Sequence, residues 1–262
     1  MVGCRAPEPV MEPLRFVNIP TEDAALSQEM LAPMIDYLSK ELGREVELLT
    51  VSDFAAAVEA MKYNHADFGR FGAFSYVLAT QEADVEAIVG DIKKSTGTLS
   101  YQSLIIARAD SNVTDLNGKS FAFLDVASTS GHLIPATYIK KHGIELGETF
   151  FAGTHNAVIQ AIKNGTVDAG AVSDSRFLLA LDEGLIEEGE LVVLWTSDPI
   201  PSPPIVVQAS LDSALKDEIR QAFLAMPPEI VESLNWKSVG FGEMSDSDFD
   251  VIREVQETLG LD

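Results

Sequence analysis

Three consecutive small hydroxyl side chains, Ser128, Thr129 and Ser130, lie between an apolar run at residues 120–125 and a second run at residues 131–141 that ends in two lysines. The first run is typical of a buried strand and the second of a helix. The first N–H groups of a helix have no partner within it, and they carry the positive end of its dipole. Together with three hydroxyl donors, this turn favours the binding of an anion. A single serine that caps the helix is the simpler interpretation, but one cap uses only one hydroxyl.

Other polar residues are candidates for the same site. His155 follows a predicted strand and opens a helix, where a histidine can donate to an anion, act as a general base or cap the helix. Arg70 ends a short apolar strand, and it can pair there with an anionic ligand or with a neighbouring carboxylate. Tyr76 and Tyr101 can each donate a hydroxyl into a cleft, although tyrosines more often pack in a core.

The sequence lacks the motifs of the commonest catalytic and cofactor sites. It contains no GxGxxG, P-loop or GxSxG pattern, and its four histidines show no spacing typical of a metal site. We therefore expect neither a metal nor a cofactor. A triad can be assembled from Ser130, His155 and Asp174, but nothing in their spacing requires it, so hydrolysis is the less favoured alternative to binding.

The composition predicts a large globular protein with an acidic surface. Of the 262 residues, 46% are hydrophobic, which is enough for one large domain or two smaller ones. Lys and Arg number 18 against 41 Asp and Glu, and the formal charge of −23 argues against nucleic acid or an anionic membrane surface as a partner. A bound anion opposes this overall field, so we expect neutral donors and helix ends to hold it.

The N-terminal stretch is similar to the processed end of a bacterial lipoprotein. Small residues precede Cys4, the only cysteine, and a polar stretch with several prolines follows it. We therefore expect a lipid-modified Cys4, a disordered tether over residues 1–13, and an apolar signal segment that this sequence does not include. The alternative is an incidental cysteine in a disordered terminus. A single cysteine allows no internal disulfide, and no apolar run is long enough to span a bilayer.

Strand and helix patterns alternate along most of the chain and predict two α/β units. The first unit has predicted strands at residues 14–19, 46–51, 66–71 and 85–90, with intervening helices at about 22–42, from 54 and from 74. The second has predicted strands at 101–108, 120–125, 149–152, 169–172 and 191–195, with helices at 131–141, 156–164 and 175–183. A proline-rich connection leads to a strand at 205–208, and the remainder is predicted to be mostly helical, at 213–226 and 246–259.

The chain crosses between the two units twice, near residues 104–108 and 205–208, which predicts a hinged pair of lobes. Lobe 1 is expected to comprise residues 14–104 and 205–262, and lobe 2 residues 105–204. In open α/β sheets a ligand lies beyond the carboxyl ends of strands. The hydroxyl-rich turns fall at such ends, so we expect the site in a cleft between the lobes.

These residues also resemble a known family. The run from Phe123 to Asp125, followed by Ser128 to Gly131 and then by Pro135 and Tyr138, resembles the ligand loop of the PhnD-like phosphonate- and phosphite-binding proteins of ABC transporters. Further matches occur in order along the chain, at Asp53-Phe54, Val58 to Met61, Asp67, Gly72, Ser75-Tyr76, Ala79, Tyr101 to Ser103, Thr154-His155, Asn164 to Asp168 and Pro199 to Pro201. The resemblance extends from Leu14 to about Met226, and it is specific as a set rather than through any one motif.

The resemblance implies the α/β fold of a two-lobed, type II periplasmic binding protein, with two parallel-rich sheets joined by two hinge strands. It implies a non-enzymatic, periplasmic receptor that delivers a phosphorus oxyanion to an ABC permease and ATPase. It also implies a set of oxyanion ligands, namely Ser128, Thr129, Ser130, His155 and Tyr101. We expect Arg70 and Tyr76 to engage the ligand as the lobes close.

Departures from the family pattern indicate the ligand. Members that bind aminoalkyl phosphonates have a tyrosine where this chain has Phe54, and carboxylates where it has Ser175 and Pro203. A buried ammonium without a carboxylate is costly, so such ligands are disfavoured. Phe54 offers an apolar wall that suits phosphite or methylphosphonate, whereas phosphate loses a hydrogen bond there, at roughly 1–3 kcal/mol. The alternatives are a receptor for phosphate or another phosphonate, the ligand-sensing partner of a signalling system, and a small-phosphoester hydrolase.

Overall fold

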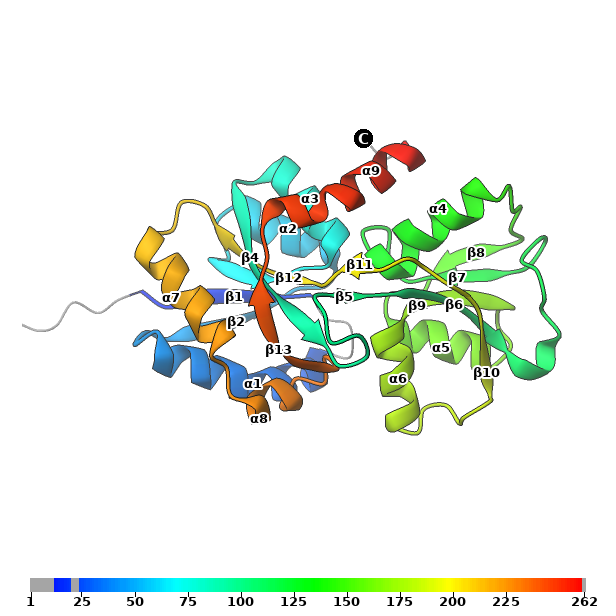
Figure 1. Ribbon diagram of the computed structural model, residues 1–262, viewed down its shortest axis with the longest axis horizontal. Coiled ribbons are helices and arrows are strands. Elements are labelled where there is room, and N and C mark those ends of the chain that lie inside the picture. The colour runs from blue at the N-terminus through cyan, green and yellow to red at the C-terminus, as the bar shows by residue number, and fades with distance from the viewer. Residues whose placement is uncertain (1–11, 20–23, 261–262) are drawn as a thin grey trace, which may run out of the picture.

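The computed structural model describes residues 12–19 and 24–260 of the chain. Cys4, with the rest of residues 1–11 of the predicted tether, lies outside the described residues. Two sheets follow one another along the long axis of the molecule, and each has helices on both sides (Figure 1). The predicted α/β class and the two units are confirmed. We call them the first and the second unit, after the order in which the chain enters them.

The first unit contains a six-stranded sheet in the order β13-β4-β12-β3-β1-β2. Its strands are β1 (Leu14–Asn18), β2 (Val46–Thr50), β3 (Phe68–Arg70), β4 (Val85–Lys93), β12 (Pro204–Gln208) and β13 (Ser238–Glu243). Strand β1 pairs in parallel with β2 and β3, whereas β12 and β13 pair antiparallel to β4. The helices of this unit are α1 (Ala24–Glu41), α2 (Phe54–Lys62), α3 (Ala73–Glu82), α7 (Ser213–Leu224), α8 (Pro228–Ser233) and α9 (Asp250–Leu259).

The second unit contains a five-stranded sheet in the order β10-β6-β9-β7-β8. Its strands are β6 (Ser103–Arg108), β7 (Phe121–Phe123), β8 (Thr149–Phe151), β9 (Ala169–Ser173) and β10 (Leu191–Thr196). Strand β7 pairs in parallel with β8 and β9, and β6 pairs antiparallel with β9 and β10. Its helices are α4 (Ile134–Lys141), α5 (His155–Lys163) and α6 (Asp174–Asp182), and a single π-helical turn at Thr129–Leu133 precedes α4.

The chain crosses between the units slightly earlier than the sequence predicts. Strand β5 (Ser100–Tyr101) pairs antiparallel with β11 (Ile200–Pro201), and these two form a separate ribbon between the sheets (Figure 1). The predicted crossing residues 104–108 belong instead to the second sheet, and residues 205–208 belong to the first. The predicted strand at 101–108 is therefore interrupted at Gln102, and the sheets divide close to the predicted lobe boundaries rather than on them.

A second difference concerns the C-terminal part of the chain, which is not purely helical. Strand β13 forms the edge of the first sheet beside β4, between α8 and the last helix. Its sequence contains Gly240 and Gly242, which weaken the strand pattern because glycine is disfavoured in strands. Pairing with β4 therefore forms this strand, and it is a long-range contact that local periodicity does not reveal.

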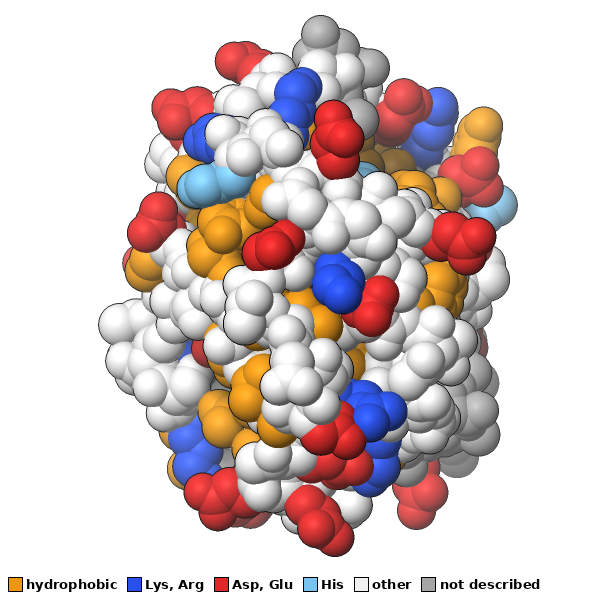
Figure 2. Space-filling model, turned by 90° about the vertical axis from the view of Figure 1, so that its right-hand side faces the viewer, with side chains coloured by type: hydrophobic (Ala, Val, Ile, Leu, Met, Phe, Trp, Pro, Cys, Tyr) orange, Lys and Arg blue, Asp and Glu red, His pale blue; other side chains and the backbone are white. Residues whose placement is uncertain are grey.

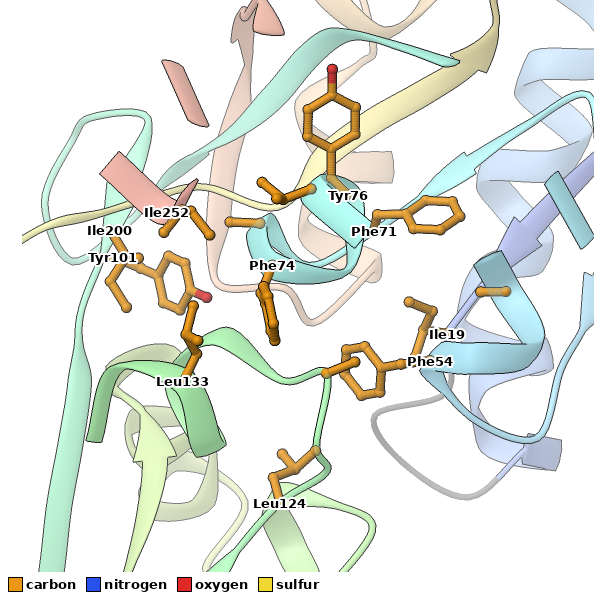
Figure 3. Close-up of a cluster of buried hydrophobic side chains, with 14 of the residues drawn as sticks. Ile19, Phe54, Phe71, Phe74, Tyr76, Tyr101, Leu124, Leu133, Ile200 and Ile252 are labelled. Carbon is orange, nitrogen blue, oxygen red and sulfur yellow. The ribbon is translucent and has the colours of Figure 1, made fainter. Parts of the chain in front are cut away.

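One hydrophobic cluster is shared by both units. Phe54 and Phe74 of the first unit pack in the same cluster as Leu124 and Leu133 of the second, and Figure 3 shows these side chains facing one another from separate elements. Helix α9 adds a further connection, because it packs on both α3 and α4 (Figure 1). The two units are thus in direct contact through this cluster, to which α9 also contributes Ile252.

Acidic residues are spread over the end of the molecule that the second unit forms (Figure 2). Figure 2, which looks at the end formed by the second unit, shows acidic side chains dispersed among hydrophobic ones and a smaller number of Lys and Arg. No helix in the described part of the chain is long and apolar enough to cross a membrane.

Candidate anion-binding site

A cavity of about 80 Å³ lies between the two units. Its walls come from both of them, with Phe54, Arg70 and Gly72 from the first unit and Ser128 and His155 from the second. A single water needs roughly 10–15 Å³ of such space, so the cavity has room for only a few non-hydrogen atoms. The ligand that fits it is therefore small.

Five helical segments begin at this cavity. Phe54 and His155 are the first residues of α2 and α5, and Gly72, Ser128 and Ser173 are the N-caps of α3, the π-helical turn and α6; all five line the cavity. Each N-terminus places the positive end of its helix dipole beside the same space. This convergence is what an anion needs, and it explains how a protein of net charge −23 can hold one.

The three hydroxyl residues of the turn have three different roles. Ser128 Oγ accepts a hydrogen bond from Gly131 N (3.1 Å), so it is the helix cap that the simpler interpretation predicts. Thr129 Oγ1 accepts from the backbone N–H of Phe74 (2.8 Å), in the first unit. Ser130 is fixed through its backbone, whose carbonyl accepts from Ser103 Oγ (2.7 Å). All three are buried and line the cavity, so capping and cavity lining coexist in one turn.

The tight geometry of this turn depends on Gly131. A Cβ atom on Gly131 would lie 2.4 Å from Leu124 Cβ, so no larger residue fits without a shift of the backbone. The small residue lets the π-helical turn pack directly on the end of the strand segment that precedes it. The local sequence therefore places the three hydroxyl residues at the cavity.

His155 is buried and uncharged. Its Nδ1 atom is buried and has no hydrogen-bond partner among the described residues. Burial, together with the smaller effect of the positive charge of Arg176, lowers the pKa of His155 to about 3. A neutral imidazole offers one N–H donor and one acceptor, and the tautomer follows from the partner it meets. An anion in the cavity would satisfy the unpartnered nitrogen by accepting its N–H.

Three cationic side chains, Arg70, Lys93 and Arg176, also line the cavity. The expectation that neutral donors and helix ends alone hold the anion is therefore incomplete. Among the described residues that line the cavity, none is acidic. The sequence analysis did not identify Lys93 and Arg176 as site residues, although both, like the hydroxyl turn, lie at the end of a strand or the start of a helix. Lys93 ends β4, and Arg176 lies in the first turn of the helix after β9.

Arg70 pairs with a neighbouring carboxylate, which is one of the two partners that the sequence allowed. Its Nη2 atom lies 3.4 Å from each carboxylate oxygen of Asp91, and its guanidinium stacks on the Trp236 ring at 4.1 Å. Its Nε atom is buried without a hydrogen-bond partner in the described structure. Arg70 is thus held by a carboxylate and an aromatic face while it lines the cavity.

The two tyrosines occupy different environments. Tyr101 lines the cavity, and burial raises its pKa to about 12, although hydrogen bonds with Ser130 and Thr129 oppose that rise. Tyr76 does not line the cavity: its hydroxyl donates to Asp246 Oδ1 (2.8 Å), and its ring packs on Phe249. Figure 3 shows the Tyr76 hydroxyl pointing away from Phe54 and Tyr101. The structure therefore does not bring Tyr76 together with the other predicted ligands.

The arrangement does not form a catalytic triad. His155 Nδ1 has no partner in the described structure, and the Asp174 carboxylate accepts instead from Ser175 N (2.6 Å) and Ser95 Oγ (3.1 Å). Within residues 12–19 and 24–260, no three His, Cys, Asp or Glu side chains are grouped so that they could hold a metal ion.

A family model and several known proteins match most of this chain. A family model described as "ABC transporter, phosphonate, periplasmic substrate-binding protein" matches residues 16–249. The Phosphate-import protein PhnD of Mycolicibacterium smegmatis is 29% identical over 284 residues, covering 95% of this chain and 86% of that protein. The Phosphonates-binding periplasmic protein of Escherichia coli is 29% identical over 240 residues, covering 85% of this chain and 70% of that protein.

Solved structures show the same fold. PhnD1 of Prochlorococcus marinus, in complex with methylphosphonate, has a TM-score of 0.85 and 22% identity, covering 95% of this chain and 98% of that chain. The binding component of an ABC phosphonate transporter from Pseudomonas aeruginosa has a TM-score of 0.84 and 22% identity, covering 93% of this chain and 85% of that chain.

Proposed function

Because this chain belongs to the periplasmic substrate-binding proteins of phosphonate ABC transporters, we propose that it binds phosphite or methylphosphonate for import. Proteins of this family are periplasmic receptors rather than enzymes, and they work with a membrane permease and an ATPase. The family fixes the class of ligand as a small phosphorus compound. The proposal concerns which compound this cavity accepts.

The observation that carries the proposal is that the cavity combines many donors with an apolar side chain, Phe54. Donors come from the turn at Ser128 to Ser130, from His155 and from the three cations, and the Phe54 ring offers none. A phosphorus centre with three oxygens and one P–H or P–CH₃ group matches such a site. The oxygens take the donors, and the fourth substituent needs none.

The lack of an acidic lining residue disfavours aminoalkyl phosphonates. Ser175 and Pro203 line the cavity at the positions where the family resemblance places ammonium-binding carboxylates. Neither side chain carries a charge, and Arg176 beside them is cationic. A ligand ammonium buried there would meet no carboxylate among the described lining residues, so its desolvation would be poorly compensated.

Phosphate is the competing ligand, because a relative with 29% identity is named as a phosphate-import protein. Phosphate differs from phosphite in carrying a fourth oxygen. Placed against Phe54, that oxygen would lose its hydrogen bonds to water without gaining any, at roughly 1–3 kcal/mol. This free energy corresponds to an affinity lower by roughly 5- to 150-fold.

Isothermal titration calorimetry with phosphite, methylphosphonate, phosphate and 2-aminoethylphosphonate tests the proposal. We expect tight binding of phosphite or methylphosphonate, weaker binding of phosphate, and no binding of the aminoalkyl ligand. The variant Ser128→Ala/His155→Ala should lose this binding, whereas exposed His65→Ala should keep it. Phosphate binding as tightly as phosphite would contradict the proposed ligand. If none of the four compounds binds, the proposed class of ligand is wrong.

We also propose that the two units move as lobes about β5 and β11 and close on the ligand. The ribbon formed by β5 and β11 lies between the two sheets, and Tyr101 of β5 lines the cavity. Closure would exclude water and strengthen each hydrogen bond to the ligand. Small-angle scattering should show a more compact protein when phosphite is present, and an unchanged radius of gyration would contradict lobe closure.

Lipid modification of Cys4 remains a proposal from the sequence. It is supported by the small residues before Cys4 and by the proline-containing polar stretch after it. When the chain is secreted behind a lipoprotein signal, mass spectrometry of the N-terminal peptide should find an acylated Cys4, and Cys4→Ser should release the protein from the membrane fraction. An unmodified wild-type peptide would contradict the proposal.

A further inference from the structure

We propose that Lys93 is a direct ligand of the bound oxyanion and that, with Arg70, it makes the site favour the doubly charged form of that anion. The inference rests on the proposed function and extends it to the charge of the ligand. It is drawn from a cluster of buried charges at the end of β4 that the sequence did not single out.

The centre of this cluster is Asp91, whose side chain is completely buried. It forms ion pairs with Lys93 and Arg70, and Ser238 Oγ donates to it (2.6 Å). Burial opposes its ionisation, but the two cations and the Ser238 hydrogen bond hold the pKa of Asp91 below its usual value. Asp91 does not line the cavity, whereas both of its cations do. The carboxylate thus sits behind two cations that face the ligand space.

Among the described residues, one N–H of the Lys93 ammonium has no hydrogen-bond acceptor. Its ammonium can make three hydrogen bonds, and its two acceptors in the structure are the Asp91 carboxylate and the Trp236 carbonyl (3.2 Å). The side chain is 4% exposed, so bulk water offers little to the third N–H. Because Lys93 lines the cavity, an anion placed there is the natural acceptor.

The charges around Lys93 leave the site positive. Arg70, Lys93 and Arg176 line the cavity, against two carboxylates, Asp91 and Asp174, which lie behind the lining. Burial is the main cause that lowers the pKa of Lys93, and Arg70 lowers it further, while Asp91 and Asp174 oppose the change. An anion that enters would stabilise the ammonium, and two negative charges would do so more than one.

Titration of His155 does not contribute to the change of ligand affinity with pH. It stays neutral down to a pH of about 3, so it does not titrate between about pH 5 and about pH 8. The second ionisation of a phosphate group falls within that range, near pH 6. We use phosphite, the proposed ligand, as the probe. A change in affinity across this range therefore reports on the ligand and on the cations that meet it.

The test uses four proteins: the wild type, Lys93→Met, Lys93→Met/Asp91→Asn, and Lys94→Met, which alters the exposed neighbour. The double variant removes the lysine and its counter-charge together, so it leaves the net charge of the cluster unchanged and no carboxylate short of a partner. Phosphite affinity is measured by calorimetry at about pH 5 and about pH 8, and thermal unfolding checks that each variant folds.

We expect Lys93→Met and the double variant each to lose at least about tenfold in phosphite affinity at the higher pH. Both should also show a smaller gain in affinity between the lower and the higher pH than the wild type and Lys94→Met do. If the double variant binds like the wild type, Lys93 serves only to neutralise Asp91, and the inference is wrong. If the wild type itself fails to bind phosphite or methylphosphonate, the proposed function fails instead.

Discussion

The hydroxyl of Thr129 accepts a 2.8 Å hydrogen bond from the backbone N–H of Phe74, and this bond connects the two units at the cavity. Phe74 lies in the first turn of α3, where a backbone N–H has no partner within the helix. Thr129 lies in the π-helical turn of the second unit. The turn that lines the cavity therefore also satisfies a helix end of the opposite unit.

We expect Thr129→Val to weaken phosphite binding by about 5- to 150-fold, because it preserves shape but leaves the buried Phe74 N–H unsatisfied, at roughly 1–3 kcal/mol. Thr137→Val is a matched control, since the Thr137 hydroxyl is also buried but donates to Leu133 O within its own helical segment (2.8 Å). Calorimetry on both variants checks the prediction. Equal affinities would show that the bond between the units does not contribute to binding.

Substitution by phenylalanine should lower phosphite affinity at one of the two tyrosines and leave it unchanged at the other. Tyr101→Phe is expected to reduce phosphite affinity, because its hydroxyl belongs to the hydrogen-bonded group of Ser130 and Thr129 at the cavity. Tyr76→Phe is expected to leave the affinity unchanged and to lower the free energy of unfolding by about 1 kcal/mol, through loss of its bond to the partly exposed Asp246. Calorimetry and urea unfolding measure the two effects. Loss of affinity in Tyr76→Phe would restore Tyr76 as a ligand candidate.

A carboxylate at position 175 should change the ligand preference. We expect Ser175→Glu to bind 2-aminoethylphosphonate measurably and phosphite at least about tenfold more weakly, because it adds an ammonium partner and repels the anion. Ser175→Gln has the same size and no charge, so it should gain no affinity for the aminoalkyl ligand. Competition calorimetry distinguishes the two variants. If both variants bind 2-aminoethylphosphonate, the size of the side chain at position 175, rather than its charge, controls which ligand binds.

The buried neutral His155 should make the protein less stable in acid. The unfolded chain takes up a proton below a pH of about 6.5, whereas the native state resists protonation down to about 3, so stability falls as the pH decreases between these values. From about pH 7.5 to about pH 5, this contribution amounts to about 2 kcal/mol.

His155→Gln should lose that part of the pH dependence in urea unfolding, while exposed His65→Gln should keep it. Both variants retain the many carboxylates that also titrate in acid, so the comparison isolates the imidazole. Parallel pH profiles for the wild type and His155→Gln would indicate that the imidazole is not held neutral by burial.

The sequence by itself determined the α/β alternation, the two units and the chemistry of the hydroxyl turn. These features are local, because apolar spacing records which face of a strand or helix is buried, and small hydroxyl residues before a helix record a capped N-terminus. The family resemblance added the ligand class. Most of the predicted site residues line the cavity, in agreement with their predicted positions at strand ends and helix starts. They are Phe54, Arg70, Tyr101, Ser128, Thr129, Ser130 and His155.

Only the tertiary structure decided which polar groups face the ligand space. Lys93 and Arg176 join the cavity because the ends of β4 and β9 meet there, whereas Tyr76 is drawn away by Asp246, 170 residues later in the chain. Strand β13 forms because β4 offers it a partner, and it brings Ser238 to Asp91. These are contacts between distant segments. Their partners are fixed by sheet pairing and packing, and the local sequence pattern of a single segment does not reveal them.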